Sequence, residues 1–409
     1  MLLAPGLAGA WGMLLVLVAA GGWALAVSDA RLESRPVWAF VAIGAAFVVA
    51  VAVAPRGSHD LWSYVMYGRT VAVHHASPYV HAPRDYPRDP FVHLVGAGWR
   101  GTRSVYGPLF TGVSTVLSKL AGASVARARL AFQGLALLGV IAALALIWLQ
   151  SRSVRAVAFV GLHPAVVTAI VNGGHNDALV GLAVVGGAVL IARRRYGVAG
   201  VVVGLGVLVK LSTGFGLLGL AVWAFARGRA NAARFVAAAV LTTAVGYAFT
   251  GLISLRDVAN ASESTSRASL WSPVSSIDAD AARVLAIGLV VVLACIGAHR
   301  FRDAPRPWLP IGVAFAAYLL AGAYVLPWYA AWVLPTLALA RRSWIAVLVG
   351  VQSALLVGLY ELSRQVAPGT VAGVARGVVV LGTAAAALAI YVVRLARPGS
   401  PTPALAEPG

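Results

Sequence analysis

Apolar segments long enough to cross a lipid bilayer recur along almost the whole sequence. A window of about 20 residues, the length of helix that spans the hydrocarbon core, finds them at 7–27, 37–55, 130–150, 155–171, 178–192, 197–209, 211–226, 234–252, 282–298, 308–326, 328–340, 343–360 and 370–393. Backbone polar groups must be paired internally in lipid, so each segment is expected to be a helix. With 60% hydrophobic residues, 11% charged residues and a mean hydropathy of +0.86, the chain is predicted to be an all-α polytopic membrane protein of about 13 transmembrane helices.

Basic residues are distributed unevenly between alternate loops, and this predicts the orientation of the chain. One set of loops carries 17 arginines, whereas the alternate set carries four basic residues. The positive-inside rule places the first set in the cytoplasm and the N-terminus outside. Residues 56–129 then form a long outer loop with interfacial helices, in which the apolar stretch 106–122 is re-entrant or interfacial. We expect one transmembrane domain over residues 1–398, followed by a disordered cytoplasmic tail at 399–409.

Two further features limit the possible functions. The net charge of +19 does not indicate nucleic-acid binding, because the basic residues lie in short loops rather than on one face of a folded domain. Cys295 is the only cysteine and lies in an apolar run, which excludes a disulfide within the chain and a cysteine metal site. The first apolar segment has no basic stretch before it, so we expect a retained helix rather than a signal peptide.

Nearly all the polar sequences that interrupt the apolar pattern fall on the predicted outer side. They are the loop that begins at 57, NGGHND at 172–177, VKLST at 209–213, the loop 256–278 and LPWYAAW at 326–332. Ionisable groups within or next to a membrane are costly and mark functional sites. Their convergence on one face predicts a single outward-facing active site.

The stretch GSHDLWSYVMYGR, residues 57–69, predicts a short helix that begins near Asp60. In a structural interpretation, Asp60 caps this helix, its aliphatic residues face lipid, and Tyr64 and Tyr67 lie at headgroup level. In a functional interpretation, Asp60 takes a proton from an attacking hydroxyl, and Tyr64 is an aromatic wall for a sugar. His59 either tunes this carboxylate and contacts substrate or is incidental.

The segment NGGHNDALVGLAVVGG places His175, Asn176 and Asp177 at the start of a helix, directly after a Gly-Gly turn. A helix cap explains Asn176 or Asp177 but not all three side chains together, so we interpret them as substrate-binding residues. The N–H groups of the following helix also favour an anion. A metal site formed by His175, Asp177 and Asp60 is conceivable, but the spacing does not specify one, and we expect neither a metal nor another cofactor.

Lys210 stands between two apolar helices that a tight outer turn would join. It either extends its ammonium toward the membrane surface or binds the phosphate of a lipid-linked substrate, with Ser212 and Thr213 as additional donors. Trp328 and Tyr329 follow a proline. They are either residues of the aromatic belt or walls of a lipid or sugar cavity.

A secondary transporter or lipid-carrier flippase is an alternative, in which His175, Asp177 and Lys210 form a proton or substrate pathway. Such proteins usually contain internal repeats with interrupted helices at corresponding places. The sequence contains no second copy of NGGHND or of DLWSY, and the long first outer loop is unusual for a carrier. A non-catalytic scaffold would not need the clustered His, Asp, Lys and aromatic residues. An enzyme is therefore favoured.

Seven pieces of the sequence, in order, carry a resemblance to a known family. They are DLWSYVMYGR, ASPY at 76–79, SVYGPLF at 104–110, NGGHNDALVGLAVVGG, VLVKLSTG, WSPVSS and LPWYAAWVLP. From about residue 55 to 340 the chain resembles the actinobacterial polyprenol-phosphomannose-dependent α-1,6-mannosyltransferases, which are GT-C membrane glycosyltransferases. The chain is shorter than these, and DLWSY and KLST depart from the usual forms of their motifs.

The resemblance implies a fold, a reaction and a place for it. The fold would be a GT-C-type bundle in the plasma membrane, and the active site would face the extracytoplasmic side. The enzyme would move a sugar, most simply mannose, from a polyprenyl phosphate to a cell-envelope glycan or glycolipid, with inversion. Asp60 would be the catalytic base, and Tyr79 and Tyr106 would contact substrate. An arabinofuranosyl donor on the same carrier is the closest alternative.

Overall fold

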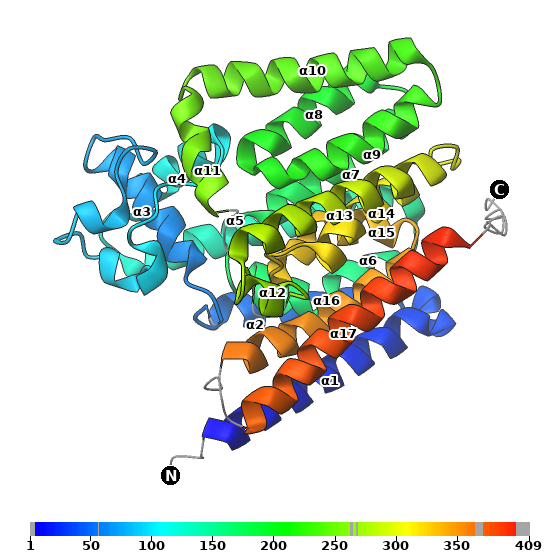
Figure 1. Ribbon diagram of the computed structural model, residues 1–409, viewed down its shortest axis with the longest axis horizontal. Helices are drawn as coiled ribbons and strands as arrows, with labels where there is room; N and C mark the ends of the chain where they lie inside the picture. Colours follow the sequence, from blue (N-terminus) through cyan, green and yellow to red (C-terminus); the bar gives the residue numbers. More distant parts are fainter. Residues whose placement is uncertain (1–4, 56, 262–264, 267–268, 365–370, 398–409) are drawn as a thin grey trace.

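The computed structural model describes residues 5–55, 57–261, 265–266, 269–364 and 371–397, and every regular element among them is helical. The predicted tail at 399–409 lies outside the described residues. The helices (Figure 1) are α1 (Pro5–Ser28), α2 (Pro36–Ala52), α3 (Asp60–Ala72), α4 (Pro108–Ala121), α5 (Val125–Ser151), α6 (Val154–Gly161), α7 (Asp177–Ala192), α8 (Tyr196–Val209), α9 (Gly214–Phe225), α10 (Arg229–Ala248), α11 (Arg256–Ala261), α12 (Ser272–Ser275), α13 (Ala279–Arg300), α14 (Trp308–Ala321), α15 (Leu334–Ala338), α16 (Trp344–Arg364) and α17 (Val371–Ala396). The all-α prediction is confirmed.

Several helices have the length and composition of membrane spans. Three described helices qualify singly, namely Val125–Ser151, Ala279–Arg300 and Gly377–Ala396. Two bent pairs also qualify, one with a 50° bend between α6 and the π-helix η5 (Ala165–Val171), and one with a 107° bend after α10. Most other expected segments form apolar helices of 10–17 residues. These helices fit a membrane protein, and the number of about 13 spans stays a prediction.

The expectation of one continuous helix at 328–340 is wrong. This segment forms a 3-10 helix, η8 (Pro327–Trp332), and then the short helix α15, with a break at Val333. Pro335 has no backbone N–H and fixes its own φ, so the α-helical hydrogen-bond pattern cannot run through this point. The residues from Pro327 to Ala338 are all buried. The segment therefore forms part of the protein interior and not a wall that faces lipid.

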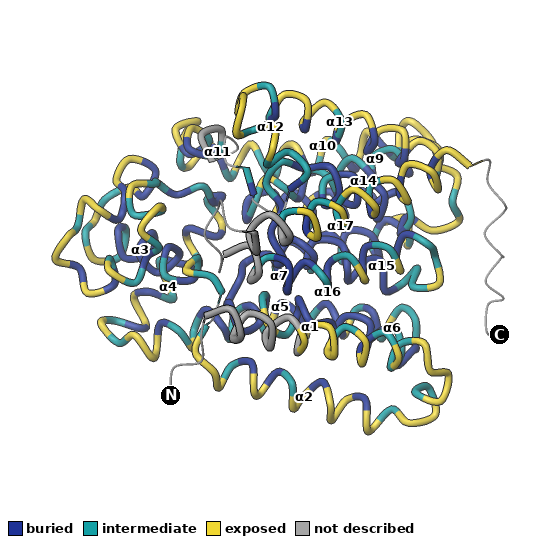
Figure 2. Tube along the Cα trace, turned by 60° about the horizontal axis from the view of Figure 1, so that its bottom comes forward, coloured by how far each residue is buried: buried dark blue, intermediate teal, exposed yellow. Residues whose placement is uncertain are grey.

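The bundle has a buried centre and an apolar outer surface. Helices α7 and α15 and the segment η8 are mostly or fully buried, while α2 and α13 are exposed along much of their length (Figure 2) and many of their exposed residues are apolar. Close approach at the centre depends on small residues: a Cβ added at Gly181 of α7 would lie 2.0 Å from the Ala331 carbonyl oxygen of η8. Helices α3 and α4 pack together at one end of the bundle, beside α11 (Figure 1).

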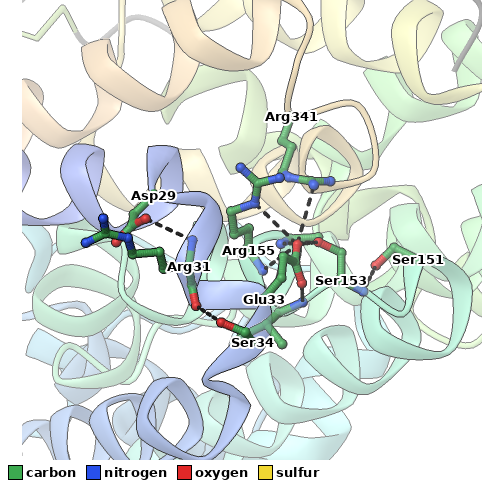
Figure 3. A network of polar contacts seen from close by, with 10 residues as sticks. Asp29, Arg31, Glu33, Ser34, Ser151, Ser153, Arg155 and Arg341 are labelled. Carbon is green, nitrogen blue, oxygen red and sulfur yellow. Dashed lines mark hydrogen bonds and ion pairs between the residues drawn. The ribbon is translucent and has the colours of Figure 1, made fainter.

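A carboxylate holds the other end of the bundle together (Figure 3). Glu33, in the short helix η1 (Ala30–Ser34), accepts hydrogen bonds from Ser153 Oγ and, at 2.8 Å, from the backbone N–H of Val154. Its Oε1 also lies 3.3 Å from Arg155 Nε and 3.6 Å from an Arg341 guanidinium nitrogen. Burial would raise the pKa of Glu33, but these hydrogen bonds hold it below its ordinary value. The cluster joins α1, α6 and the loop before α16.

Candidate active site

A cavity of about 270 Å³ lies between α3, the loop before α4, the turn between α8 and α9, helix α13 and the segment from α14 to η8. Among the described residues, its charged lining side chains are Asp60, Lys210 and Arg283. Aromatic and aliphatic side chains form most of the rest of the wall. One carboxylate and two cations in apolar surroundings suit a ligand that has both a polar and an apolar part.

Asp60 is the first residue of α3 and not its cap, contrary to expectation. His59 is the N-cap residue without a side-chain capping bond, and Ser58 Oγ accepts from the Asp60 backbone N–H at 3.1 Å. The Asp60 carboxylate therefore remains available to the cavity, where its side chain is 24% exposed. Burial raises its pKa to about 6, against the opposing effect of Lys210 and with a further contribution from Asp177. A carboxylate with this pKa can act as a base near neutral pH.

Helix α3 is buried on nearly all sides, so the expectation that its aliphatic residues face lipid is wrong. Leu61, Tyr64, Val65 and Met66 are at most 1% exposed. One cause is α4, which packs so closely on α3 that a Cβ at Gly68 would lie 2.2 Å from a carbonyl oxygen of α4. The alternation of aromatic and aliphatic residues, which resembles an interfacial helix, belongs here to a helix surrounded by protein.

The turn at 172–177 brings the predicted residues His175, Asn176 and Asp177 close to Tyr64 and Asp60 of α3. Gly174 has a φ of +64°, which a residue with a side chain rarely adopts, and the turn places His175 under the start of α3. His175 Nδ1 lies 3.3 Å from Tyr64 OH and 3.7 Å from a carboxylate oxygen of both Asp60 and Asp177. The Tyr64 hydroxyl also donates to Asn176 Oδ1 at 3.5 Å.

His175 is fully buried in this turn, outside both adjacent helices, and its ring stacks on Trp328 at 4.1 Å between centroids. Burial lowers its pKa well below the ordinary value, and the nearby Lys210 lowers it further, so the imidazole is neutral. The stacked ring packs against the back of Trp328, whose side chain lines the cavity. His175 therefore supports the cavity wall from behind and does not itself line the cavity.

Lys210, the C-cap residue of α8, points into the protein toward Asp177. Its Nζ lies 2.8 Å from Asp177 Oδ1, which is completely buried and also accepts a hydrogen bond from Trp332 Nε1. The ammonium lies 4.7 Å from the ring centre of Tyr329 and 5.3 Å from that of Trp332. The Asp177 carboxylate thus fixes Lys210 at the cavity wall, and the two predicted residues form one unit.

The other predicted site residues divide into two groups. Tyr106, Trp328 and Tyr329 line the cavity together with Tyr67 of α3. His59 and Tyr79 do not line it: His59 Nδ1 lies 3.0 Å from the Leu94 carbonyl oxygen, and Tyr79 OH donates to the Tyr106 carbonyl oxygen at 3.0 Å. These two residues hold the outer loop in place.

The lining residues that sequence reasoning missed include Arg283, Tyr318, Tyr324 and Trp332. Trp332 follows Tyr329 by three residues, a spacing that places both on one side of a 3-10 helix, and this signal was available. Arg283 carried no signal, because an arginine near the end of an apolar segment is usual in membrane proteins. Within the described ranges, no group of three or more His, Cys, Asp or Glu residues could hold a metal ion.

Comparison with known proteins bears on the first half of the chain, which contains Asp60, the 172–177 turn and Lys210. The family model described as alpha-(1→6)-mannopyranosyltransferase, N-terminal domain, matches residues 3–227. No curated protein and no solved structure matches the chain. The match covers more than half of the 409 residues and agrees with the resemblance in the sequence motifs. The chain belongs to the alpha-(1→6)-mannopyranosyltransferase family.

Proposed function

We propose that this mannosyltransferase takes mannose from a polyprenyl phosphate and transfers it, with inversion, to a hydroxyl of a cell-envelope glycan or glycolipid on the extracytoplasmic side of the plasma membrane. The observation that carries the proposal is the position of Asp60. Its carboxylate, which has a pKa of about 6, reaches a cavity whose other walls are mainly aromatic and aliphatic.

The reaction is a single displacement at the anomeric carbon. Asp60 takes the proton from the acceptor hydroxyl while the acceptor oxygen forms a bond to C1 of mannose. The bond between C1 and the phosphate oxygen breaks, and its electron pair stays on the departing polyprenyl phosphate. Among the described residues, Asp60 is the only carboxylate that lines the cavity, because Asp177 is buried against Lys210. With one carboxylate at the sugar, direct attack that inverts C1 is favoured over a covalent glycosyl-enzyme.

Lys210 supports the developing negative charge. Its Nζ is fixed by Asp177 and by the rings of Tyr329 and Trp332, so it needs little reorganisation when the donor phosphate departs. The aromatic rings also offer flat surfaces for the sugar. We expect transfer to need no metal ion, and membranes treated with EDTA should retain full activity.

These observations support the two alternative functions, arabinofuranosyl transfer and transport, less well. The matched family is described by mannose transfer, which favours mannose over arabinofuranose as the sugar. For a transporter, the residues of the 172–177 turn would have to lie along a path through the protein. His175 and Asp177 are instead fully buried and held by neighbouring side chains.

An Asp60→Asn variant tests the proposal. Membranes that contain the protein are incubated with radiolabelled polyprenyl phosphate mannose, and in parallel with the arabinose donor, and the labelled glycolipids are separated. Wild type should transfer mannose, and Asp60→Asn should lose at least about 10²-fold in rate because the base is removed. Asp303→Asn, at an exposed aspartate beyond the far end of α13, is the control. Wild-type turnover by Asp60→Asn would remove Asp60 from this role, and label from neither donor with wild type would refute the proposed function.

A further inference from the structure

One tryptophan from the connection between α3 and α4 reaches the cavity. Trp99 ends the short 3-10 helix η4 (Ala97–Trp99), and this connection lies beside α3 at the end of the bundle (Figure 1). The Trp99 side chain lines the cavity together with Asp60 and Tyr67 of α3. Among the described lining residues, it is the only one from the stretch 73–104. This stretch therefore presents a single large and flat side chain to the cavity.

Trp99 differs from the other tryptophans of the cavity wall in its contacts within the protein. Trp328 stacks on His175 with 4.1 Å between the ring centroids. Trp332 stacks on Tyr329 at the same distance. Trp99, which is partly exposed, makes no such ring contact and no side-chain hydrogen bond with any described residue. Because a tryptophan N–H usually finds a partner where it is buried, the ring and the N–H of Trp99 are available to a ligand.

The loop that carries Trp99 is attached to α3 at two points. At the start of α3, His59 Nδ1 lies 3.0 Å from the Leu94 carbonyl oxygen. Two turns further along, Tyr67 OH donates to the Thr102 carbonyl oxygen at 3.0 Å. The residue after Trp99 also fixes the loop through two side-chain hydrogen bonds to carbonyl oxygens, at 2.8 and 3.0 Å. Trp99 lies between the two points of attachment, so little order remains to be gained when a ligand binds to it.

The two substrates of the proposed reaction would meet different parts of the cavity. The donor is a membrane lipid, and its departing phosphate is expected at Lys210, which Asp177 holds at the wall. In an inverting displacement, the acceptor oxygen attacks C1 from the side opposite to this phosphate, where Asp60 must reach the acceptor hydroxyl. Trp99 belongs to a loop that is expected outside the membrane and is attached next to Asp60. Its position therefore suits the acceptor rather than the donor.

We propose that Trp99 binds the acceptor sugar, with its ring against the apolar face of the pyranose and its indole N–H directed to a sugar hydroxyl. This inference rests on the proposed function and adds a contact on the acceptor side of the reaction. A pyranose presents C–H groups on its ring face and hydroxyls at its edge, and an amphipathic indole can meet both. His59 is then a positioning residue, which acts through the loop and not on the sugar.

The test measures separate KM values for the two substrates with purified full-length protein. The donor is radiolabelled polyprenyl phosphate mannose, and the acceptor is the glycolipid extract of membranes in which wild type transfers label. Trp99→Ala should raise the acceptor KM roughly 10- to 70-fold, the effect of no longer covering about 60–100 Å² of apolar ring surface, and should leave the donor KM unchanged. Trp99→Phe, which keeps a flat ring, should recover most of the loss, whereas Trp99→Leu should not.

The matched control is Trp38→Ala, because Trp38 is 71% exposed on α2 and does not line the cavity. It should keep both KM values of wild type. The Phe and Leu variants decide the test if Ala destabilises the loop, since both side chains fill the space and only one has a ring. If the Trp99 variants keep the acceptor KM of wild type, or raise the donor KM equally, this inference is refuted and the proposed function stands. If wild type transfers no mannose, the proposed function itself fails.

Discussion

The pH dependence of transfer tests the electrostatics of Asp60 most directly. Burial raises the pKa of this carboxyl to about 6, Lys210 lowers it, and Asp177 raises it. The base must be ionised to take a proton, so activity should rise with pH through this value. For a group with a pKa of 6, about 0.1 is ionised at pH 5 and about 0.9 at pH 7. The kcat/KM for the donor should therefore rise about tenfold between these two pH values.

The partners of Asp60 allow this prediction to be checked in both directions. Lys210→Met removes a positive charge that lowers the pKa of Asp60, so the rise in activity should move to higher pH. Asp177→Asn removes a negative charge that raises this pKa, so the rise should move to lower pH. Both variants are expected to transfer more slowly, and the position of the pH midpoint is therefore the informative quantity.

The assay measures kcat/KM from initial rates of labelled mannose transfer. The pH range should extend about 1.5 to 2 pH units on either side of the expected midpoint, from about pH 4.5 to about pH 8. This parameter reports the free enzyme and excludes product release, which matters because the released phosphate monoester itself titrates near pH 6. Burial holds the pKa of His175 well below its ordinary value, so His175 should not add a second inflection near pH 6. A flat profile from pH 5 to 7, or midpoints that move in the same direction in the two variants, would refute the role assigned to Asp60.

Two further predictions concern the packing of the fold. Gly181→Ala would place a Cβ against the Ala331 carbonyl oxygen and should cost about 1–3 kcal/mol of stability. The loss should appear as a lower melting temperature in detergent. The control is Gly186→Ala on the same helix, where no atom lies closer than 3.5 Å to the new Cβ and the melting temperature should not fall. Glu33→Gln should destabilise the protein at pH 7. Because folding lowers the pKa of Glu33, its carboxylate stabilises the fold at pH values above the ordinary pKa of 4.5. The difference in melting temperature between the variant and wild type should therefore shrink as the pH falls below 4.5. An equal difference at pH 7 and pH 4 would contradict this direction.

The sequence predicts that the fold is helical and which residues are candidates for the site. It predicts less well how these residues are arranged in space. Asp60, the 172–177 turn and Lys210 stand out because polar groups in an apolar sequence are costly and few. That Asp177 and Lys210 form a pair could not be predicted, since they are 33 residues apart and either could have faced a ligand. The burial of Tyr64 was missed for a related reason. An aromatic helix has the same sequence pattern whether water and headgroups or α4 cover it.

The apolar residues of α13 that line the cavity also could not be assigned from the sequence. Ile287 and Val291 have the composition of lipid-facing residues whether or not a cavity lies beside them, and only the three-dimensional position of α13 at the cavity decides between the two. The matched range 3–227 supplies Asp60, Lys210 and eight other lining residues, Tyr67 and Tyr106 among them, and the remaining lining residues come from segments beyond it. The proposed base Asp60 lies in the matched range, whereas the aromatic and aliphatic wall is shared between this range and α13, α14 and η8. We expect substitutions in that wall to change the preference for sugar or carrier length, with Asp60 left in place.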